Sequence, residues 1–261
     1  MNFTLLKLGG SLITDKSKPY TLREKFIKNV SEEIFRAKKE DPSLNIILGN
    51  GAGSFAHQSA KKFNTIDGVT NDVDRFGASL VHYDAQRLNQ ILLENFLQLK
   101  MPILPVHPSS FIHAIDKKVD SIDDFMFVKL IELGYMPITY GDVIIDLKIG
   151  ATILSTDLLF KKLAERLNFN GHKVSIIHAG DYDGVLDKKN QAIKEINAEN
   201  LASITSLKST QNVDVTGGMK KKVEEMVSIA KLGITSQIIN GTVAGNIYKT
   251  LQGENLGTKI C

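Results

Sequence analysis

The chain has 261 residues, of which 23% are charged and 43% hydrophobic, as is ordinary for a globular protein with one sizeable core. A net charge of +3 is too small to indicate a nucleic-acid partner, and no stretch approaches the roughly 18–20 apolar residues of a membrane span. Cys261 is the single cysteine, which excludes an internal disulfide and favours a reducing compartment. Because the apolar N-terminal run is too short for a secretion signal, we expect a cytoplasmic enzyme or binding protein without a membrane partner.

Short apolar runs alternate along the chain with longer segments of helical periodicity. In chain order they predict strand 3–8, helix 23–39, strand 44–48, a helix from the 49–53 loop to residue 62, helix 72–99, strand 103–106, helix 123–133, strand 136–140, hairpin 141–154, helix 156–167, strand 173–178, a polar surface excursion 187–211, helix 218–232, strand 234–239 and strand 258–260. This alternation predicts an α/β fold, a three-layer αβα sandwich around a mostly parallel open sheet. Ligands of such folds bind at the carboxyl ends of the strands.

The first predicted strand carries a lysine and ends in a glycine turn. Lys7 is costly to bury in an apolar strand unless it pairs with an anion, so it either faces water or binds an anionic ligand. The amides of the next turn, Gly9-Gly10-Ser11, can form an anion-binding nest beside it, which favours the second interpretation. Lys16 is close enough in sequence to swing over the same space.

The segment GNGAGSFAH, residues 49–57, follows the second predicted strand. Its glycines permit close approach of the backbone to a ligand, and the helix that follows offers free N–H groups at its start. The loop lacks the Lys-Ser ending of a Walker loop, and Ala56 stands where a dinucleotide-binding loop has glycine. His57 alone is more often a surface or capping residue, but beside an anion nest it would be a charged hydrogen-bond donor to phosphate.

Two later helix starts also combine charge with small residues. Asp157 begins the helix 156–167, where a carboxylate either stabilises the helix N-terminus or holds two lysines in place. Thr216-Gly217-Gly218 opens the helix 218–232, and the lysines at 220, 221 and 222 fall in its first turn. Because positive charge there opposes the helix dipole, these lysines suit an anionic ligand better than they suit stability. Two anion sites without a Walker loop indicate a phosphoryl group held between two phosphate-bearing ligands.

Taken in order, the segments KLGGS, GNGAGSFAH, YGD, STD, DYDGV and DVTGGMKKK resemble the amino acid kinase superfamily. The glycine loop ending in histidine, the AKKF that follows it, VDVTGGM and the closing GENLGTKI are similar to the isopentenyl phosphate kinase branch. The resemblance covers nearly the whole chain. It implies an open αβα sandwich, a homodimer, and ATP-dependent phosphorylation of isopentenyl phosphate to isopentenyl diphosphate by direct in-line transfer.

The resemblance also implies one domain over residues 1–261, with an acceptor lobe at about 1–155 and a nucleotide lobe at about 156–261. Lys7 and Lys222 would contact the transferring phosphoryl group, Lys16 would close over it, and Asp157 would orient the lysines. On the acceptor side it implies His57 with the amides of Ala52, Gly53 and Ser54, and also Gly10, Gly141, Val143 and Ile153. Near the nucleotide it implies Lys7, Gly9, Gly10, Ser11, Gly180, Asp181, Asp183, Gly184, Gly217, Lys220 and Lys222.

An apolar acceptor tail would need an apolar pocket. Candidates are the 76–80 helix face, Tyr83, Val143 and Ile153, for each of which core packing is the alternative. Ala56 stands where related loops carry glycine and would narrow the acceptor pocket.

A phosphate monoester has a second pKa of about 6, so the acceptor is mostly a dianion near neutral pH and needs no general base. We expect Mg²⁺ to ride on the ATP phosphates and predict no protein metal site, since the sequence has no dedicated carboxylate cage. Two alternatives stay open. One is a kinase of another small phosphate or phosphonate, such as a fosfomycin-type kinase, and the other is a non-catalytic nucleotide-binding protein.

Overall fold

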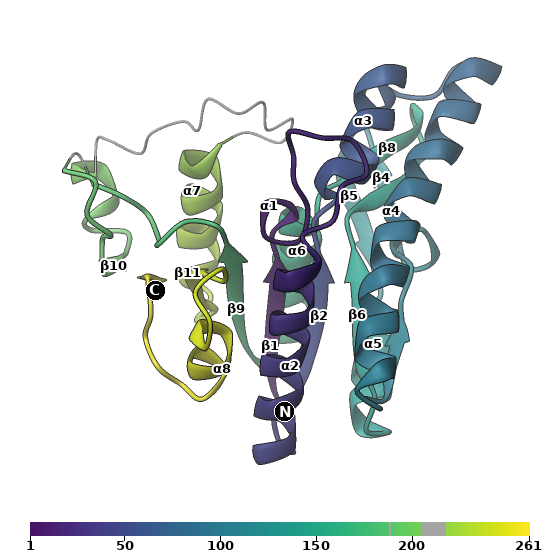
Figure 1. Cartoon of the computed structure of the whole chain (residues 1–261). Coiled ribbons are helices and arrows are strands. Elements are labelled where there is room, and N and C mark those ends of the chain that lie inside the picture. The colour runs from purple at the N-terminus through teal and green to yellow at the C-terminus, as the bar shows by residue number, and fades with distance from the viewer. Residues whose placement is uncertain (188, 205–217) are drawn as a thin grey trace.

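The computed structural model describes residues 1–187, 189–204 and 218–261 (Figure 1). Its helices are α1 (Gly10–Ile13), α2 (Glu24–Glu40), α3 (Gly53–Phe63), α4 (Asp72–Gln98), α5 (Phe125–Glu132), α6 (Thr156–Phe169), α7 (Met219–Ala230) and α8 (Asn246–Leu251). Its strands are β1 (Asn2–Leu8), β2 (Ile46–Asn50), β3 (Ile103–Pro105), β4 (Ile112–Ile115), β5 (Lys118–Ile122), β6 (Met136–Tyr140), β7 (Asp142–Asp146), β8 (Gly150–Leu154), β9 (Lys173–Gly180), β10 (Glu195–Ile196), β11 (Thr235–Asn240) and β12 (Thr258–Ile260).

The main sheet has eight strands in the order β10-β12-β11-β9-β1-β2-β6-β3. Its paired strands are parallel, apart from the antiparallel pair of β11 and β12. β1 lies between β2 and β9, so that Lys7 is in register with Gly49 on one side and with His178 on the other. The carboxyl ends of these three strands therefore meet at one edge of the sheet.

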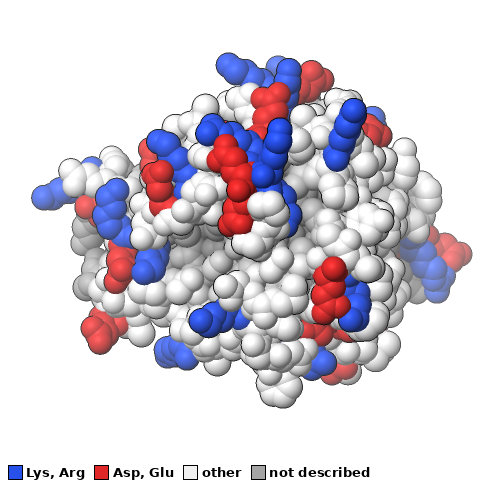
Figure 2. Space-filling model, turned by 90° about the horizontal axis from the view of Figure 1, so that it is seen from below, with Lys and Arg blue, Asp and Glu red and all other residues white. Residues whose placement is uncertain are grey.

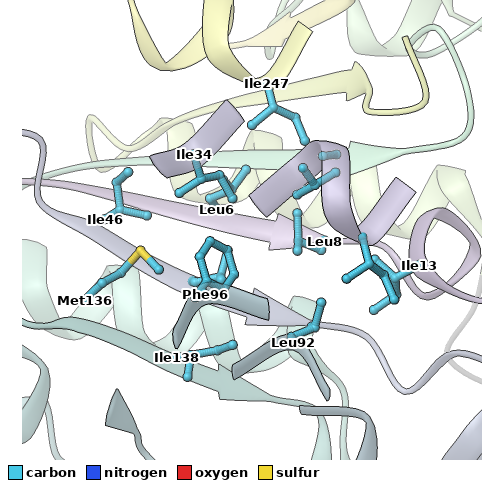
Figure 3. Close-up of a cluster of buried hydrophobic side chains, with 14 of the residues drawn as sticks. Leu6, Leu8, Ile13, Ile34, Ile46, Leu92, Phe96, Met136, Ile138 and Ile247 are labelled. Atoms are coloured by element: carbon cyan, nitrogen blue, oxygen red, sulfur yellow. The ribbon is translucent and has the colours of Figure 1, made fainter. Parts of the chain in front are cut away.

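Helices cover both faces of this sheet. On one face, Ile34 of α2, Phe96 of α4 and Ile247 of α8 pack with Leu6 and Ile138 of the strands (Figure 3). On the other face, α5, α6 and α7 pack against β1 and its neighbours through a second buried apolar cluster. The burial of each large apolar side chain in these clusters contributes about 1.5–3 kcal/mol. The expected three-layer αβα sandwich is confirmed.

A smaller sheet of four strands, in the order β5-β4-β7-β8, lies beside α4. Its β7–β8 hairpin matches the one predicted over residues 141–154. Tyr140, Val143 and Ala151 form a small buried cluster with Val81 and Ala85 of α4. This cluster fixes the hairpin against the long helix, next to the carboxyl edge of the main sheet.

The structure extends and shifts some predicted elements. The second strand begins at Ile46 and runs to Asn50, because Gly49 and Asn50 pair with Lys7 and Leu8 of β1. The first two residues of the predicted glycine loop are therefore strand. The short helices α1 and α8 and the strands β4, β5 and β10 were not predicted. Residue 188 and residues 205–211 of the predicted surface excursion lie outside the described residues.

The opposite end of the molecule carries the amino ends of the strands. Figure 2 shows this end, where Lys and Arg side chains lie next to Asp and Glu. Across the described residues, no helix combines the length and apolar character needed to cross a membrane.

Candidate active site

A cavity opens at the carboxyl edge of the main sheet, where residues of α1 and of the start of α3 line it. Of the residues predicted from the sequence, those that line it are Lys7, Gly9, Gly10, Ser11, Lys16, Ala52, Gly53, His57, Gly141, Ile153, Asp157, Asp181 and Lys222. Described residues that were predicted for the site but lie outside this lining are Ser54, Val143, Gly180, Asp183, Gly184 and Lys220. Gly217 lies outside the described residues. The structure thus brings together all five residues predicted to be catalytic.

The centre of the cavity is a carboxylate between two lysines. Asp157 lies in the first turn of α6, whose N-cap Ser155 accepts a hydrogen bond from the amide of Leu158 at 3.2 Å. Lys7 donates to Oδ2 of Asp157, and Nζ of Lys222 lies 3.6 Å from the same oxygen. Burial alone would raise the pKa of Asp157, but the charges of Lys7 and Lys222 hold that pKa well below its usual range. Asp157 is therefore ionised and holds both ammonium groups beside the cavity.

The loops after β1 and β2 pack backbone to backbone beneath the cavity. A Cβ on Gly10 would lie 2.6 Å from the amide nitrogen of Gly53, and Gly53 itself has a φ of +55°. Both positions therefore require glycine. Cε of Lys16 lies 3.7 Å from where a Cβ on Gly10 would stand, so Lys16 extends over the same loop.

Thr14 joins these two loops. Its hydroxyl donates to the carbonyl of Gly10 at 2.7 Å and accepts from the amide of Ser54 at 2.9 Å. The Ser54 amide, which the family resemblance implied as a phosphate donor, thus serves the packing of the loops. Ala52 and Gly53, which line the cavity at the start of α3, are the positions where the helix can receive an anion.

His57 lies one turn into α3 and is partly buried at the cavity wall. Ala56 beside it is buried and also lines the cavity, so its methyl group takes up space there, as predicted. Beyond these two residues the wall becomes apolar, with Ala60 of α3, Ile66, Val81 of α4 and Ile153 of β8.

Of the residues named as candidates for the apolar pocket, Ile153 is the one that lines the described cavity. Val143 packs in the core cluster with Tyr140 and Ala151, so core packing holds for this residue. Phe76 and Tyr83 are exposed on α4, and Phe76 packs edge-on against Phe63. The register of α4 turns Val81 toward the cavity instead.

The opposite wall of the cavity is polar and comes from the second half of the chain and from α1. Ser11 donates to Oδ1 of Asp181 at 2.7 Å, and Nζ of Lys222 lies 3.5 Å from the hydroxyl of Tyr182. The Tyr182 ring lies against Gly180, where a Cβ would come within 2.6 Å of it. This wall faces the lysines from the side away from His57.

Three residues predicted near the nucleotide lie outside the cavity lining and contact other parts of the chain. Asp183 accepts from Nδ2 of Asn240 at 2.7 Å, and Gly184 has a φ of +131° and packs on Thr258. Lys220 is exposed and lies 3.9 Å from Glu224 on its own helix. Of the lysines at 220–222, it is Lys222 that reaches the cavity.

Comparison with known proteins places this arrangement in a family. The model of the amino acid kinase family matches residues 2–240. The chain belongs to the amino acid kinase family. This kinase is 34% identical to isopentenyl phosphate kinase of Methanocaldococcus jannaschii over 264 residues, covering 98% of each chain. It is 33% identical to isopentenyl phosphate kinase of Methanothermobacter thermautotrophicus over 269 residues, again covering 98% of each.

Solved structures of isopentenyl phosphate kinases are also similar to this chain. A crystal structure of isopentenyl phosphate kinase matches this kinase with a TM-score of 0.81 and 27% identity, covering 99% of this chain and all of the other. The product complex of Thermoplasma acidophilum isopentenyl phosphate kinase matches with a TM-score of 0.76 and 25% identity over the full length of both chains.

The kinase also has site residues that the sequence motifs did not single out. Thr156 donates from its hydroxyl to the carbonyl of Asn50 at 2.7 Å and ties α6 to the end of β2. His178 is buried on β9, and its Nδ1 lies 3.2 Å from Oδ1 of Asp157. Burial lowers the pKa of His178 to about 4, and the contact with Asp157 offsets only part of this shift. For His178, the available signal in the sequence was a polar residue within an apolar strand, which is the signal that identified Lys7.

Proposed function

We propose that this kinase transfers the γ-phosphoryl group of ATP to isopentenyl phosphate. An oxygen of the acceptor phosphate attacks the γ-phosphorus, the bond to the β,γ-bridging oxygen breaks, and isopentenyl diphosphate and ADP leave. The observation that carries this proposal is the Lys7–Asp157–Lys222 cluster, placed between the His57 wall and the Asp181 wall. Chains named isopentenyl phosphate kinase are 34% and 33% identical to this one over 98% of its length.

The acceptor phosphate binds at the start of α3. The amides of Ala52 and Gly53 and the imidazole of His57 all line this part of the cavity. Near neutral pH a phosphate monoester is mostly a dianion, because its second pKa is about 6. The attacking oxygen therefore carries no proton, and His57 positions the acceptor as a hydrogen-bond donor.

The two lysines stabilise the charge of the transferring group. In phosphoryl transfer the protein contributes positioning and electrostatic stabilisation rather than covalent chemistry. Asp157 keeps Lys7 and Lys222 side by side against their mutual repulsion, and Lys16 closes over the group from the turn that follows α1. The cluster of one carboxylate and two ammonium groups thus presents net positive charge to the phosphates.

The apolar part of the cavity fits the isopentenyl tail. It continues from Ala56 and His57 along Ala60, Ile66, Val81 and Ile153, away from the lysines. A branched five-carbon tail gains about 25 cal/mol for each Å² of apolar surface that it buries. The wall therefore distinguishes an apolar acceptor from a polar one.

We propose that ATP occupies the wall formed by Ser11, Asp181 and Tyr182, and that residues from about 156 onward form the nucleotide lobe. Among the described residues no cluster of three His, Cys, Asp or Glu side chains is placed to hold a metal. Asp157 is engaged by lysines and Asp181 by Ser11. We therefore expect Mg²⁺ to arrive on the phosphates of ATP, the usual way this ion reaches such sites.

We also propose a homodimer, as the family resemblance implies. Val73, Phe76 and Tyr83 expose apolar surface along α4, which such an interface would cover. Light scattering distinguishes a dimer from the 28.8 kDa monomer.

The decisive experiment is an acceptor panel with ATP and Mg²⁺, read by coupled release of ADP. We expect turnover with isopentenyl phosphate and far less with fosfomycin or with a polar phosphate monoester. Preference for fosfomycin would indicate a fosfomycin-type kinase. Binding of ATP without ADP release from any acceptor would indicate a non-catalytic nucleotide-binding protein.

A further inference from the structure

His178 lies directly behind the catalytic cluster. It is on β9, in register with Lys7 on the neighbouring parallel strand β1, and it is 4% exposed. Parallel strands in register point matched side chains to the same face of a sheet. His178 and Lys7 therefore approach Asp157 together, from two adjacent strands.

The two oxygens of Asp157 have different neighbours. Oδ2 accepts from Lys7 and lies 3.6 Å from Nζ of Lys222. Oδ1 is buried and has no aligned hydrogen-bond partner among the described residues, and Nδ1 of His178 lies 3.2 Å from it.

The imidazole is neutral in this environment, so one of its nitrogens donates and the other accepts. Since a carboxylate oxygen only accepts, the contact with Oδ1 requires the proton to be on Nδ1. A neutral histidine can hold the carboxylate without adding a third positive charge next to Lys7 and Lys222.

We propose that His178 is a positioning residue for phosphoryl transfer, which donates from Nδ1 to Oδ1 of Asp157 and thereby fixes the orientation in which Oδ2 holds Lys7 and Lys222. The inference rests on the proposed function. Without this donor, Oδ1 faces the small cavity that adjoins Asp157 and His178, whose other lining residues are the apolar Ile176, Met226 and Ile229 and the charged Lys161, Lys222 and Glu225. The carboxylate then turns toward other donors and carries the lysines with it.

The test compares His178→Asn with His178→Leu in the full chain. The amide of Asn can offer an N–H close to the position of Nδ1, whereas Leu fills the space without a donor. Loss of a side chain that orients a metal ligand typically costs about 10–100-fold in activity, and we expect a similar cost for one that orients Asp157. We expect His178→Leu to lose kcat in this range with little change in KM for ATP, and His178→Asn to recover most of it.

A second measurement reads the tautomer of the wild-type protein by ¹⁵N NMR of the imidazole. We expect the proton on Nδ1 at neutral pH. A proton on Nε2, an unchanged kcat in His178→Leu, or equal loss in both variants would overturn the inference. Because the tautomer is read without turnover and needs no variant, it holds or fails independently of the proposed reaction and of folding of the Leu variant.

Discussion

At the scale of single residues, neighbouring lysines of α7 differ in what they contact. Lys222 lies within 3.6 Å of Asp157 and lines the cavity, whereas Lys221 is exposed on the helix surface. Replacing a charged group that stabilises a transition state costs on the order of 10²–10³ in turnover. We therefore expect Lys222→Met to lose kcat by this factor and Lys221→Met, the matched control, to keep it. Equal losses would mean that the whole lysine run attracts ATP by its summed charge.

His57 allows a second prediction at this scale. As a positioning donor, it is partly replaced by an uncharged donor, so His57→Gln should keep measurable turnover. His57→Ala should lose on the order of 10²–10³ in kcat. Steady-state kinetics with isopentenyl phosphate measures both. If free imidazole restored His57→Ala while His57→Gln stayed inactive, His57 would act as a proton acceptor.

At the scale of elements, the proposed acceptor site depends on how two loops are held together. Thr14 is fully buried and bonds both Gly10 and Ser54. Thr14→Val keeps the shape but removes the acceptor of the buried Ser54 amide, at a cost of about 1–3 kcal/mol in the free energy of unfolding. The carbonyl of Gly10 keeps the bond that it accepts from the backbone amide of residue 14. We expect this variant to raise KM for the acceptor.

Thr14→Ser is the control, since it retains the hydroxyl and loses only a methyl group. It should keep the acceptor KM near that of the wild type. Urea unfolding measures the stability of both variants, and acceptor titrations measure their KM. A KM that rises equally in Val and Ser variants would show that packing of the methyl group, not the hydroxyl, holds the loops.

Elements in which a regular apolar pattern continues over many residues were predicted well from the sequence. Helices at 72–98 and 219–230 and the 142–154 hairpin lie within a few residues of their predicted bounds. The four-residue helix α1 and the six-residue helix α8 are too short to show a period. The β5 strand has mostly exposed side chains, so no apolar alternation marks it.

The residues of the site also fall into those that local sequence predicts and those that it does not. Lys7, His57 and Asp157 were predicted because each stands out within its own local motif. His178 and Thr14 act on residues that are 21 and 40 positions away in sequence, respectively, and only strand pairing and loop packing bring them together. Their roles therefore follow from tertiary structure.

At the scale of the whole molecule, stability should depend on pH through a contact between layers. His82 of α4 lies 2.9 Å from both carboxylate oxygens of Asp142 in β7. The hydrogen bond to Asp142 raises the pKa of His82 against the opposing effect of burial. The protonated form therefore stabilises the fold, fully below the unfolded pKa of about 6.5, and this contribution is lost as pH rises through the folded pKa.

We accordingly expect the difference in unfolding free energy between wild type and His82→Gln to grow as pH falls from about 8 to about 6, on either side of the reference pKa. Since His82 is partly exposed, the effect should be modest. Urea unfolding across this range measures it, and all other titrating groups cancel in the comparison. Parallel curves for the two proteins would contradict the prediction.

The position of β1 between β2 and β9 has a consequence for how such an enzyme can diversify. The wall with His57 and Ile153 belongs to the stretch before residue 155, and the wall with Asp181 and Tyr182 is built mainly after it. With the acceptor on the first wall and ATP on the second, as proposed, substitutions that change acceptor preference can accumulate in one stretch while ATP binding stays unchanged. Lys7, on the shared central strand, contacts the transferring group in the proposed reaction, so we expect substitutions of Lys7 to stop the reaction whichever wall has changed.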